Sequence, residues 1–461
     1  MNNLISKSII GLLFILLVFT RSFAGLYINN YRIGEYLVGA GLLTALFLLF
    51  IPNKFIKVPL AIHNNYRFLI FAFFITIYTT GTSLTATYTY RTSSYIWTAA
   101  YIFVGYYFLK NKINKNVFFL YLSGVFIVYI FGTGSYPDFL MNIFRNYGDK
   151  FTFVKASDMV LMIIITNIIA LNSLEKKYSY YYFIFSVALF LPLIVQMSRG
   201  ALATLILFFM FYLMFNFRFI FLNLKYFILL IVIGSTTFFI STFRVTQFDF
   251  SAIATENIEI VQIVDDEFGK ISRTATNENM DTFMSLYFEQ RYVPNQYSNR
   301  NNNVKVDTGW HNKLISTDGT FDWRLSMWQD QYYYQASEEN VLFGYGHTAK
   351  LPVFDLAYDK DNVFRIGHDK ANEQIHNYLI NIFARGGLLQ LFTILSFHLI
   401  IYYIYYKKFK SHSILIFMVP PLFNAMTDIS MEGVQFPINF YLIYGYLLSE
   451  GINLKNGIAE K

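Results

Sequence analysis

The segments FRVTQFDF (243–250) and ANEQIHN (371–377) mark the two ends of a polar interruption in a chain that is otherwise a succession of apolar runs. Between Phe243 and Ile375 lie 20 of the chain's 29 carboxylates but only 12 of its 36 Lys and Arg, a net charge of −8 (12 − 20). So many charges exclude this segment from lipid, whereas each apolar run approaches the ~20 residues that cross a bilayer. The sequence therefore predicts a membrane scaffold around one aqueous loop.

The composition indicates the same class of protein. Only 14% of the residues are charged and 55% are hydrophobic, whereas about 25% of the residues in soluble domains are charged. The absence of cysteine excludes disulfides, Cys-ligated metals and thiol nucleophiles. A pI near 9.1 does not imply nucleic acid as a partner, because the basic residues form short clusters between apolar runs, as topology determinants do.

Twelve apolar runs predict an all-α polytopic membrane protein with about twelve transmembrane helices. Residues 1–242 would hold nine of them, 243–375 one large and mostly helical external loop, and 376–461 the last three. The first run imitates a signal peptide, and we expect it to be retained as a membrane helix. The runs lie near residues 8–28, 33–51, 67–87, 94–109, 117–136, 158–174, 182–197, 201–217, 226–242, 386–406, 412–430 and 434–449.

Positive charge predicts the orientation of the chain. With a cytoplasmic N-terminus, the inside segments hold 16 Lys and Arg and the short outside segments hold 7. Because cytoplasmic segments carry the excess of basic residues, both termini should be cytoplasmic. The 133-residue loop (243–375) should then be external.

Arginines recur at the external ends of the apolar runs. Each one alone is as easily read as an interfacial charge, but as a set they would form a cationic collar at the height of a lipid-linked phosphate. Arginine suits phosphate because its planar fork binds the oxygens bidentately and stays charged. No acid–base relay is expected at the membrane midplane, which weakens a proton-coupled transporter. The arginines are Arg91, Arg199, Arg244 and Arg385.

Arg199 has the most constrained setting of this set. It lies in QMSRGAL (196–202), between two apolar runs that leave almost no room for a loop. A tight external turn, allowed by Gly200, would therefore present its side chain in one place.

The best-structured part of the loop is expected between Asp318 and Gly346. Thr320 or Asp322 can cap a helix on which three residues, at i, i+4 and i+8, share one face. The aromatic members of this face would lie on the membrane or a neighbouring loop, would stack on sugar rings, or would do both. The three residues are Arg324, Trp328 and Tyr332.

His376 is the one external histidine at the entry to a membrane helix, and Asn377 follows it. One straight helix from His376 to Tyr406 would be about 46 Å long, so its first turns would stand in water, with Arg385 at the interface and half a turn away from His376. A zinc site is disfavoured, because neither a second His nor a carboxylate falls at ligand spacing.

These residues together resemble a known family. Ser198-Arg199-Gly200, the external loop, Arg324 with Trp328, Gly344-x-Gly346, and His376-Asn377 followed by Gly386 and Gly387 are similar, in order and spacing, to the O-antigen ligase and O-antigen polymerase superfamily. These are bacterial inner-membrane glycosyltransferases of the GT-C type. The resemblance covers roughly residues 195–450.

The resemblance implies a donor, a base and a mechanism. The donor would be an undecaprenyl-diphosphate-linked glycan, His376 the base, and Arg199 and Arg324 ligands of the diphosphate, with no metal or other cofactor. Trp328, Tyr332 and Asn377 are candidates for contact with the sugar or acceptor. The acceptor would be a growing glycan or lipid A core, and membrane lipid and a chain-length regulator are further expected partners.

Polymerase and ligase remain alternatives. The ligase-type pattern would have Leu at Trp328 and a small residue or Tyr at Gln390, so the sequence leans slightly to a polymerase. A polysaccharide flippase or another transporter is the alternative from a different class, although such proteins usually show repeated halves. A non-catalytic assembly protein, which would tolerate loss of His376, is the third.

Overall fold

The computed structural model describes residues 2–52, 58–134, 136–148, 154–222, 224–247, 314, 319–347, 351–354 and 375–454. The chain forms two compact units. Unit 1 consists of residues 1–67, 94–248 and 396–461, and unit 2 of residues 68–93 and 249–395. Most of the predicted loop, 243–375, lies outside the described residues, so the expectation of a mostly helical loop and the division at 242 and 375 stay predictions.

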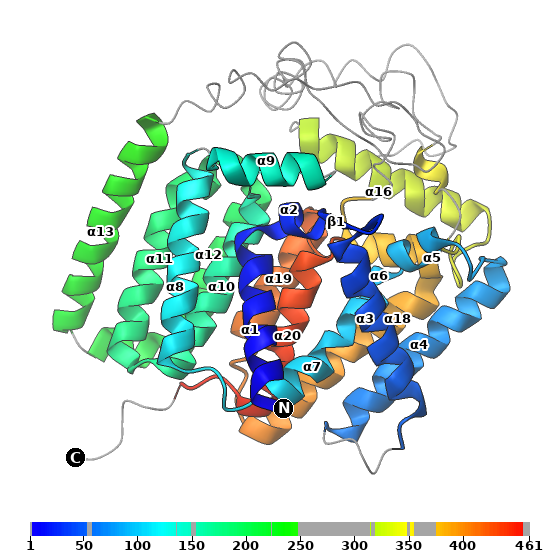
Figure 1. Ribbon diagram of the computed structural model, residues 1–461, viewed down its shortest axis with the longest axis horizontal. Coiled ribbons are helices and arrows are strands. Elements are labelled where there is room, and N and C mark those ends of the chain that lie inside the picture. The colour runs from blue at the N-terminus through cyan, green and yellow to red at the C-terminus, as the bar shows by residue number, and fades with distance from the viewer. Residues whose placement is uncertain are drawn as a thin grey trace. The chain divides into compact units, whose positions relative to one another are not determined.

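Unit 1 is a bundle of apolar helices around α10 (Ala156–Ser173) (Figure 1). The run MVLMIII (159–165) is apolar on every side, and each of its residues is buried, as expected of a helix at the centre of a bundle. Its neighbours in contact are α1 (Asn2–Val18), α8 (Lys115–Gly132), α11 (Lys176–Met197), α12 (Arg199–Leu222), α19 (Leu415–Thr427) and α20 (Gln435–Glu450).

The remaining helices of unit 1 lie around this centre. α13 (Leu224–Gln247) packs on α11, and α7 (Tyr101–Phe108) packs on α20. A two-residue antiparallel hairpin joins β1 (Tyr27–Ile28) to β2 (Tyr31–Arg32), with Tyr27 opposite Arg32. The other helices are α2 (Thr20–Ala24), α3 (Ile33–Phe50), α6 (Ser94–Ala99) and α9 (Asp138–Tyr147).

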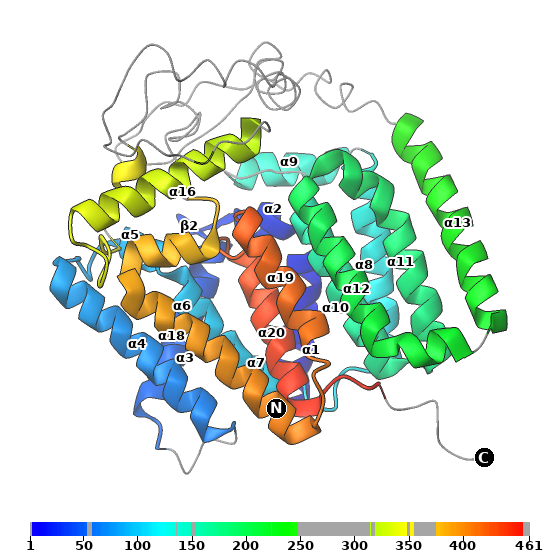
Figure 2. The same cartoon turned by 180° about the vertical axis from the view of Figure 1, so that it is seen from behind.

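Unit 2 contains the second half of α4 (Leu60–Thr80), the short α5 (Thr87–Thr92), α16 (Gly319–Ser337), the 3-10 turn η3 (Pro352–Phe354) and the first half of α18 (Tyr378–Phe409). Figure 2 shows α16 alongside the first turns of α18. A small apolar core joins α16, η3 and α18, because its buried members come from these three elements and from the residues just before η3 and α18. They are Met327, Leu351, Val353, Phe354, Ile375 and Ala384.

The prediction of an all-α polytopic membrane protein is confirmed, but the number of twelve spans is not. Among the described residues, eight helices are long and apolar enough to cross a membrane: α3, α4, α8, α10, α11, α12, α13 and α18. The run near 94–109 is divided between α6 and α7, and α1, α19 and α20 have 13 to 17 residues. A span shorter than ~20 residues cannot be recognised by length alone.

α4 begins at Leu60, seven residues before the predicted start at Arg67. Arg67 therefore lies within α4, and it binds the C-terminus of α3. The Arg67 guanidinium donates to the backbone carbonyls of Leu48, Leu49 and Ile51, at 3.2, 3.0 and 2.7 Å. A cation at a helix C-terminus satisfies carbonyls that have no partner within the helix. The charge of Arg67, a residue of α4, is therefore used by the C-terminus of α3.

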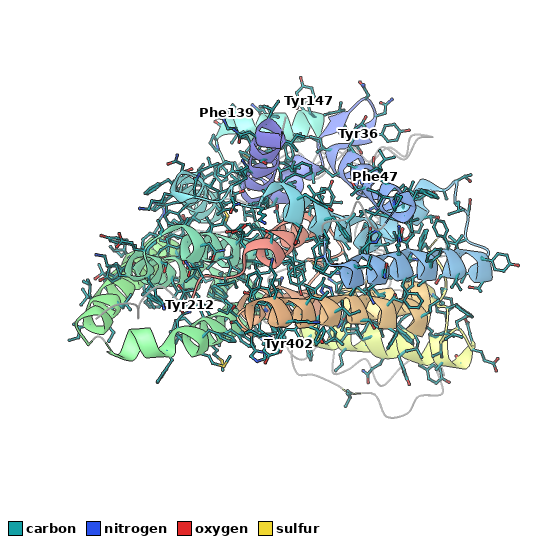
Figure 3. The ribbon with its side chains drawn as sticks, turned by 90° about the horizontal axis from the view of Figure 1, so that it is seen from below. Tyr36, Phe47, Phe139, Tyr147, Tyr212 and Tyr402 are labelled. Carbon is teal, nitrogen blue, oxygen red and sulfur yellow. The ribbon has the colours of Figure 1, made fainter. Side chains whose placement is uncertain are left out.

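α9 is a short helix with an exposed apolar stripe. Phe139, Ile143 and Tyr147, at i, i+4 and i+8, are 64%, 42% and 64% exposed, and Figure 3 shows the labelled rings of Phe139 and Tyr147 pointing outward. On the opposite side, Phe144 is 4% exposed and contacts the ring of Phe19. Ten residues span about 15 Å, too little to cross a bilayer, so this stripe fits the membrane surface.

Candidate active site

His376 lies in a short link before α18 and has a left-handed backbone, with φ of 58°. This conformation costs a non-glycine residue about 1–2 kcal/mol, although His adopts it more readily than most. The side chain is half-buried, whereas its neighbours Ile375 and Asn377 are 0% and 5% exposed. Such strain persists only where the surrounding structure determines it, and it is concentrated at functional sites.

Asn377 caps α18. Its Oδ1 accepts a hydrogen bond from the backbone N–H of Ile380 at 3.1 Å, and its carbonyl accepts one from the N–H of Asn381 at 2.8 Å. Asn is a preferred capping residue, because its side-chain oxygen satisfies an N–H that the helix leaves without a partner. α18 (Tyr378–Phe409) begins directly after this cap, which agrees with the expected helix start near His376.

α18 is broken at Gly387, where φ and ψ are 63° and −164°. The expected single straight helix is therefore wrong. A Cβ at Gly387 would collide with the backbone of Leu342 and Phe343, and beside it the Leu388 N–H donates to the Val341 carbonyl at 2.9 Å. The chain after α16 thus fits into the break, and only glycine allows so close an approach.

The Gly344-x-Gly346 motif belongs to the same junction. Both glycines have positive φ, 69° and 80°. The N–H groups of Tyr345, which lies between the glycines, and of Gly346 donate to the carbonyls of Ala384 and Arg385, each at 2.9 Å. The two glycine pairs, Gly344 with Gly346 and Gly386 with Gly387, therefore lie in one junction between the chain after α16 and α18, although they are about 40 residues apart in the sequence.

Trp328 connects α16 to the link before α18. Its Nε1–H donates to the carbonyl of Ile375 at 2.8 Å, and its half-buried ring packs on the core of unit 2 and meets Phe321 edge-on at 5.9 Å. The helix predicted around Trp328 is confirmed, and α16 runs from Gly319 to Ser337. The side chains of the two expected caps, Thr320 and Asp322, lie outside the described residues. Trp328, on the aromatic face of this helix, packs on a neighbouring segment of the chain, as one of the predictions for this face required.

Arg324 and Tyr332 flank Trp328 on α16. Arg324 is half-buried and precedes Trp328 by one helical turn, so their side chains lie on one face. Tyr332 is 56% exposed, and its ring stacks on Phe383 at 6.3 Å with an interplanar angle of 28°. Of the two aromatic side chains predicted to contact sugar, Tyr332 presents the more accessible ring.

Arg385 is 1% exposed and does not stand at an interface as the sequence suggested. Its Nη1 donates to the Gly346 carbonyl at 3.4 Å and its Nη2 to the Tyr88 hydroxyl at 3.2 Å, with the guanidinium 5.7 Å from the centre of the Tyr88 ring. Local sequence does not predict this burial, because Tyr88 lies 297 residues away. Arg385 belongs to unit 2 and lies two residues before the break in α18.

His347, which the sequence did not single out, is fully buried beside Arg385. Its Nε2 lies 3.2 Å from the Gln390 amide nitrogen, and its carbonyl accepts from the Thr92 hydroxyl at 2.8 Å. Burial, and then the Arg385 charge, lower the pKa of His347 from 6.5 to about 3. It is therefore neutral at physiological pH, and its position after Gly346 was the one available signal.

Arg91 is exposed on α5, three residues after Tyr88. The two residues are neighbours on that short helix. Arg91 thus lies within the same unit as Arg324 and Arg385, and its side chain is open to solvent.

Arg199 belongs to unit 1 and is exposed at the first position of α12. α11 ends at Met197, so Ser198 alone separates the two helices, as the predicted tight turn requires. Gly200 has a helical backbone, and a Cβ there would meet the Thr427 hydroxyl at 2.8 Å. Close packing on α19, and not the turn itself, explains this glycine.

Arg244 also belongs to unit 1 and lies in the last turn of α13. Its side chain is exposed, and its Nε donates to the Thr133 hydroxyl at 2.9 Å. The proposed arginines therefore divide into two groups, with Arg199 and Arg244 in unit 1 and Arg91, Arg324 and Arg385 in unit 2.

Residues 184–395, 212 of the 461, match the family profile described as O-antigen ligase. The resemblance seen in the sequence is confirmed over this region. It contains every residue discussed above as a site candidate except Arg91. No curated protein gives a significant match.

The family match and the apolar helices support a multi-pass membrane protein with a glycosyltransferase-like role in O-antigen assembly. A lipid-linked glycan and an acceptor are the substrates that such a role implies in general. Within the described part of the chain, no group of three or more His, Asp or Glu is placed to hold a metal ion.

Proposed function

We propose that the protein is a glycosyltransferase that moves a glycan from undecaprenyl diphosphate to an acceptor hydroxyl at the external face of the bacterial inner membrane. One observation carries the proposal: the hydrogen bond from Trp328 to the Ile375 carbonyl. It joins the helix that bears Arg324 to the residue before His376. A phosphate-binding cation and a base thus come from adjacent elements of the region that matches the O-antigen ligase family.

The chemistry requires two tasks of the protein. As the acceptor oxygen attacks the anomeric carbon, neutral His376 takes its proton, and this general-base step contributes ~10²–10⁴-fold. The bond from the anomeric carbon to the diphosphate breaks, and its electron pair leaves with the diphosphate. Arginines stabilise the charge that develops there, a task that preorganised cations can perform without a metal. A single displacement of this kind inverts the anomeric carbon.

Arg199, in unit 1, and Arg324, in unit 2, are each a first candidate for the diphosphate. Arg91 and Arg244 have exposed side chains and are further candidates. Arg385 is buried, so it would contact the phosphate only if the substrate entered the interior of unit 2. Tyr332 is the aromatic surface we assign to the sugar or acceptor. Exposure supports the roles of Arg199, Arg91, Arg244 and Tyr332, and residue type supports all of these roles.

We favour a polymerase over a ligase, because Trp328 and Gln390 depart from the ligase-type pattern. Deletion of the protein should leave surface lipid A core capped by a single repeat unit, as read on a polysaccharide gel. Core without any repeat, with full-length chains still on the carrier lipid, would identify a ligase.

The general-base role is tested in purified protein in lipid nanodiscs, with chelator present. His376→Ala should reduce transfer by about 10²–10⁴-fold and leave donor binding nearly intact, because a neutral imidazole contributes little to holding a diphosphate. The matched control is His412→Ala, an exposed histidine of unit 1 that contacts the Tyr402 hydroxyl. Wild-type turnover by His376→Ala would exclude this mechanism, and loss of wild-type activity with chelator would exclude its metal independence.

A further inference from the structure

We propose that Trp328 is a positioning residue for His376: by donating its indole N–H to the Ile375 carbonyl, it holds His376 in the left-handed backbone conformation. This inference rests on the proposed function, in which His376 is the general base. It assigns to Trp328 a use different from the sugar contact that the sequence suggested.

The first step is the geometry of the peptide plane. The carbonyl of Ile375 and the N–H of His376 belong to one planar peptide unit, so a bond that fixes the carbonyl oxygen also fixes the plane that precedes His376. The 2.8 Å bond from Trp328 does this. Rotation about φ of His376, observed at 58°, is thereby restricted.

The second step is the residue that follows. Asn377 is 5% exposed and caps α18 through Ile380. Asn377 ends the peptide plane that follows His376, so by holding Asn377 the helix cap limits rotation about ψ of His376. His376 is thus held between an anchored peptide plane and a capping residue, and its side chain is half-buried.

The third step is that the anchor is itself rigid. Trp328 packs against the buried core of unit 2, and the Phe321 ring meets its ring at an interplanar angle of 87°. An indole has one donor and no acceptor, and that donor is used by the Ile375 carbonyl. The residue is thus suited to hold a backbone and less suited to read a sugar hydroxyl.

The consequence for the reaction follows from distance. A general base must lie within about 2.6–3.2 Å of the atom whose proton it takes, and a displacement of about 1 Å can cost ~10²-fold in rate. Removing the Trp328 N–H should therefore lower kcat by about 10- to 100-fold. The KM for the lipid-linked donor should not change, because Trp328 does not hold the diphosphate.

The experiment uses the full-length protein in nanodiscs. Trp328→Phe removes the N–H and part of the ring. Incorporation of 3-benzothienylalanine at position 328 removes the N–H alone and keeps the shape, so that a folding defect cannot imitate the result. Tyr333→Phe is the matched control, since it removes one polar hydrogen from the same helix. Thermal unfolding midpoints are measured for every variant.

The decisive comparison is made in the His376→Ala background. If Trp328 acts only through His376, the double variant should have the residual rate of His376→Ala itself, because the two effects are not additive. A further loss in the double variant would show a structural role and overturn the proposal.

Failure of this inference and failure of the proposed function can be distinguished. Wild-type turnover by His376→Ala would remove the base, and with it the need for a positioning residue. An inactive His376→Ala variant with full kcat in both the Trp328→Phe and benzothienylalanine proteins would leave the proposed function intact and overturn the positioning role alone.

Discussion

His347 and His376 show how the surroundings of a residue determine its chemistry. His347 is 0% exposed and contacts Thr92 and Gln390, 255 and 43 residues away, so local sequence could not predict its burial. His376 is half-buried, and its position before a helix made it a candidate from the sequence alone. Only the structure reveals its left-handed backbone.

The buried His347 predicts acid sensitivity. Its pKa is lowered from 6.5 to about 3 in the folded protein, so the unfolded chain binds more protons between these values, and stability falls as the pH decreases through that window. His347→Gln should reduce the fall of the unfolding midpoint between pH 7 and pH 5, measured by thermal unfolding in detergent. An equal fall in the variant and the wild type would contradict this account of His347.

Substitutions of Arg199 should weaken donor binding in a graded way. Arg199→Lys keeps the charge but loses the bidentate fork, so donor affinity and rate should fall together, and Arg199→Ala should lose more than Arg199→Lys. A loss of roughly 1.5–3 kcal/mol, typical of hydrogen bonds to charged groups, corresponds to about 10- to 100-fold in affinity. Binding of the lipid-linked donor measures this, with Arg145→Ala, another exposed arginine, as control. Unchanged affinity in Arg199→Ala would remove the residue from the site.

At the scale of elements, the break in α18 has the largest consequence. The sequence shows the glycine pairs, but their spacing does not reveal that Gly344 and Gly387 meet, since a Cβ at Gly344 would lie 2.7 Å from the Gly387 nitrogen. That contact depends on the chain reversing after α16. The prediction of twelve membrane helices failed in part for a different reason: a buried apolar run can be divided into two short helices, as α6 and α7 show.

Gly387→Ala should therefore destabilise unit 2. The left-handed backbone costs an L-residue about 1–2 kcal/mol, and the collision with Leu342 adds to this cost. We expect a loss of at least about 2 kcal/mol, seen as a lower unfolding midpoint. Gly39→Ala is the control, since nothing lies within 4 Å of its Cβ position in α3, and it should be neutral or stabilising by up to ~1 kcal/mol. Equal midpoints in the two variants would contradict the junction.

We expect the exposed apolar stripe of α9 to contact the membrane surface. Because the chain has no cysteine, single thiols at Ile143→Cys and Asn142→Cys can each carry an environment-sensitive fluorophore. Nitroxide lipids labelled near the headgroup should quench the probe at 143, on the apolar stripe, more strongly than the probe at 142, on the polar side. Equal quenching at the two positions in nanodiscs would show that the stripe does not enter the interface.

At the scale of the whole molecule, hydropathy predicted the class of protein, because a buried or lipid-facing helix requires a continuous apolar run. It also predicted most helices of unit 1, of which α10 and α11 are clear cases. It could not distinguish a helix that faces lipid from one enclosed by other helices, such as α20. The candidate residues were predicted by type and order, whereas burial and hydrogen bonding, as at Arg385, depend on contacts between distant segments.

The most direct test of the central claim, transfer of a glycan from a lipid diphosphate, uses the purified wild-type protein in proteoliposomes with a lipid-linked oligosaccharide that is radiolabelled in its sugar. We predict a new covalent product of higher mass, with the anomeric configuration of the transferred sugar inverted, as determined by NMR. Its formation should depend on His376. Movement of the labelled lipid across the bilayer with no new glycosidic bond would contradict the account and identify a transporter instead.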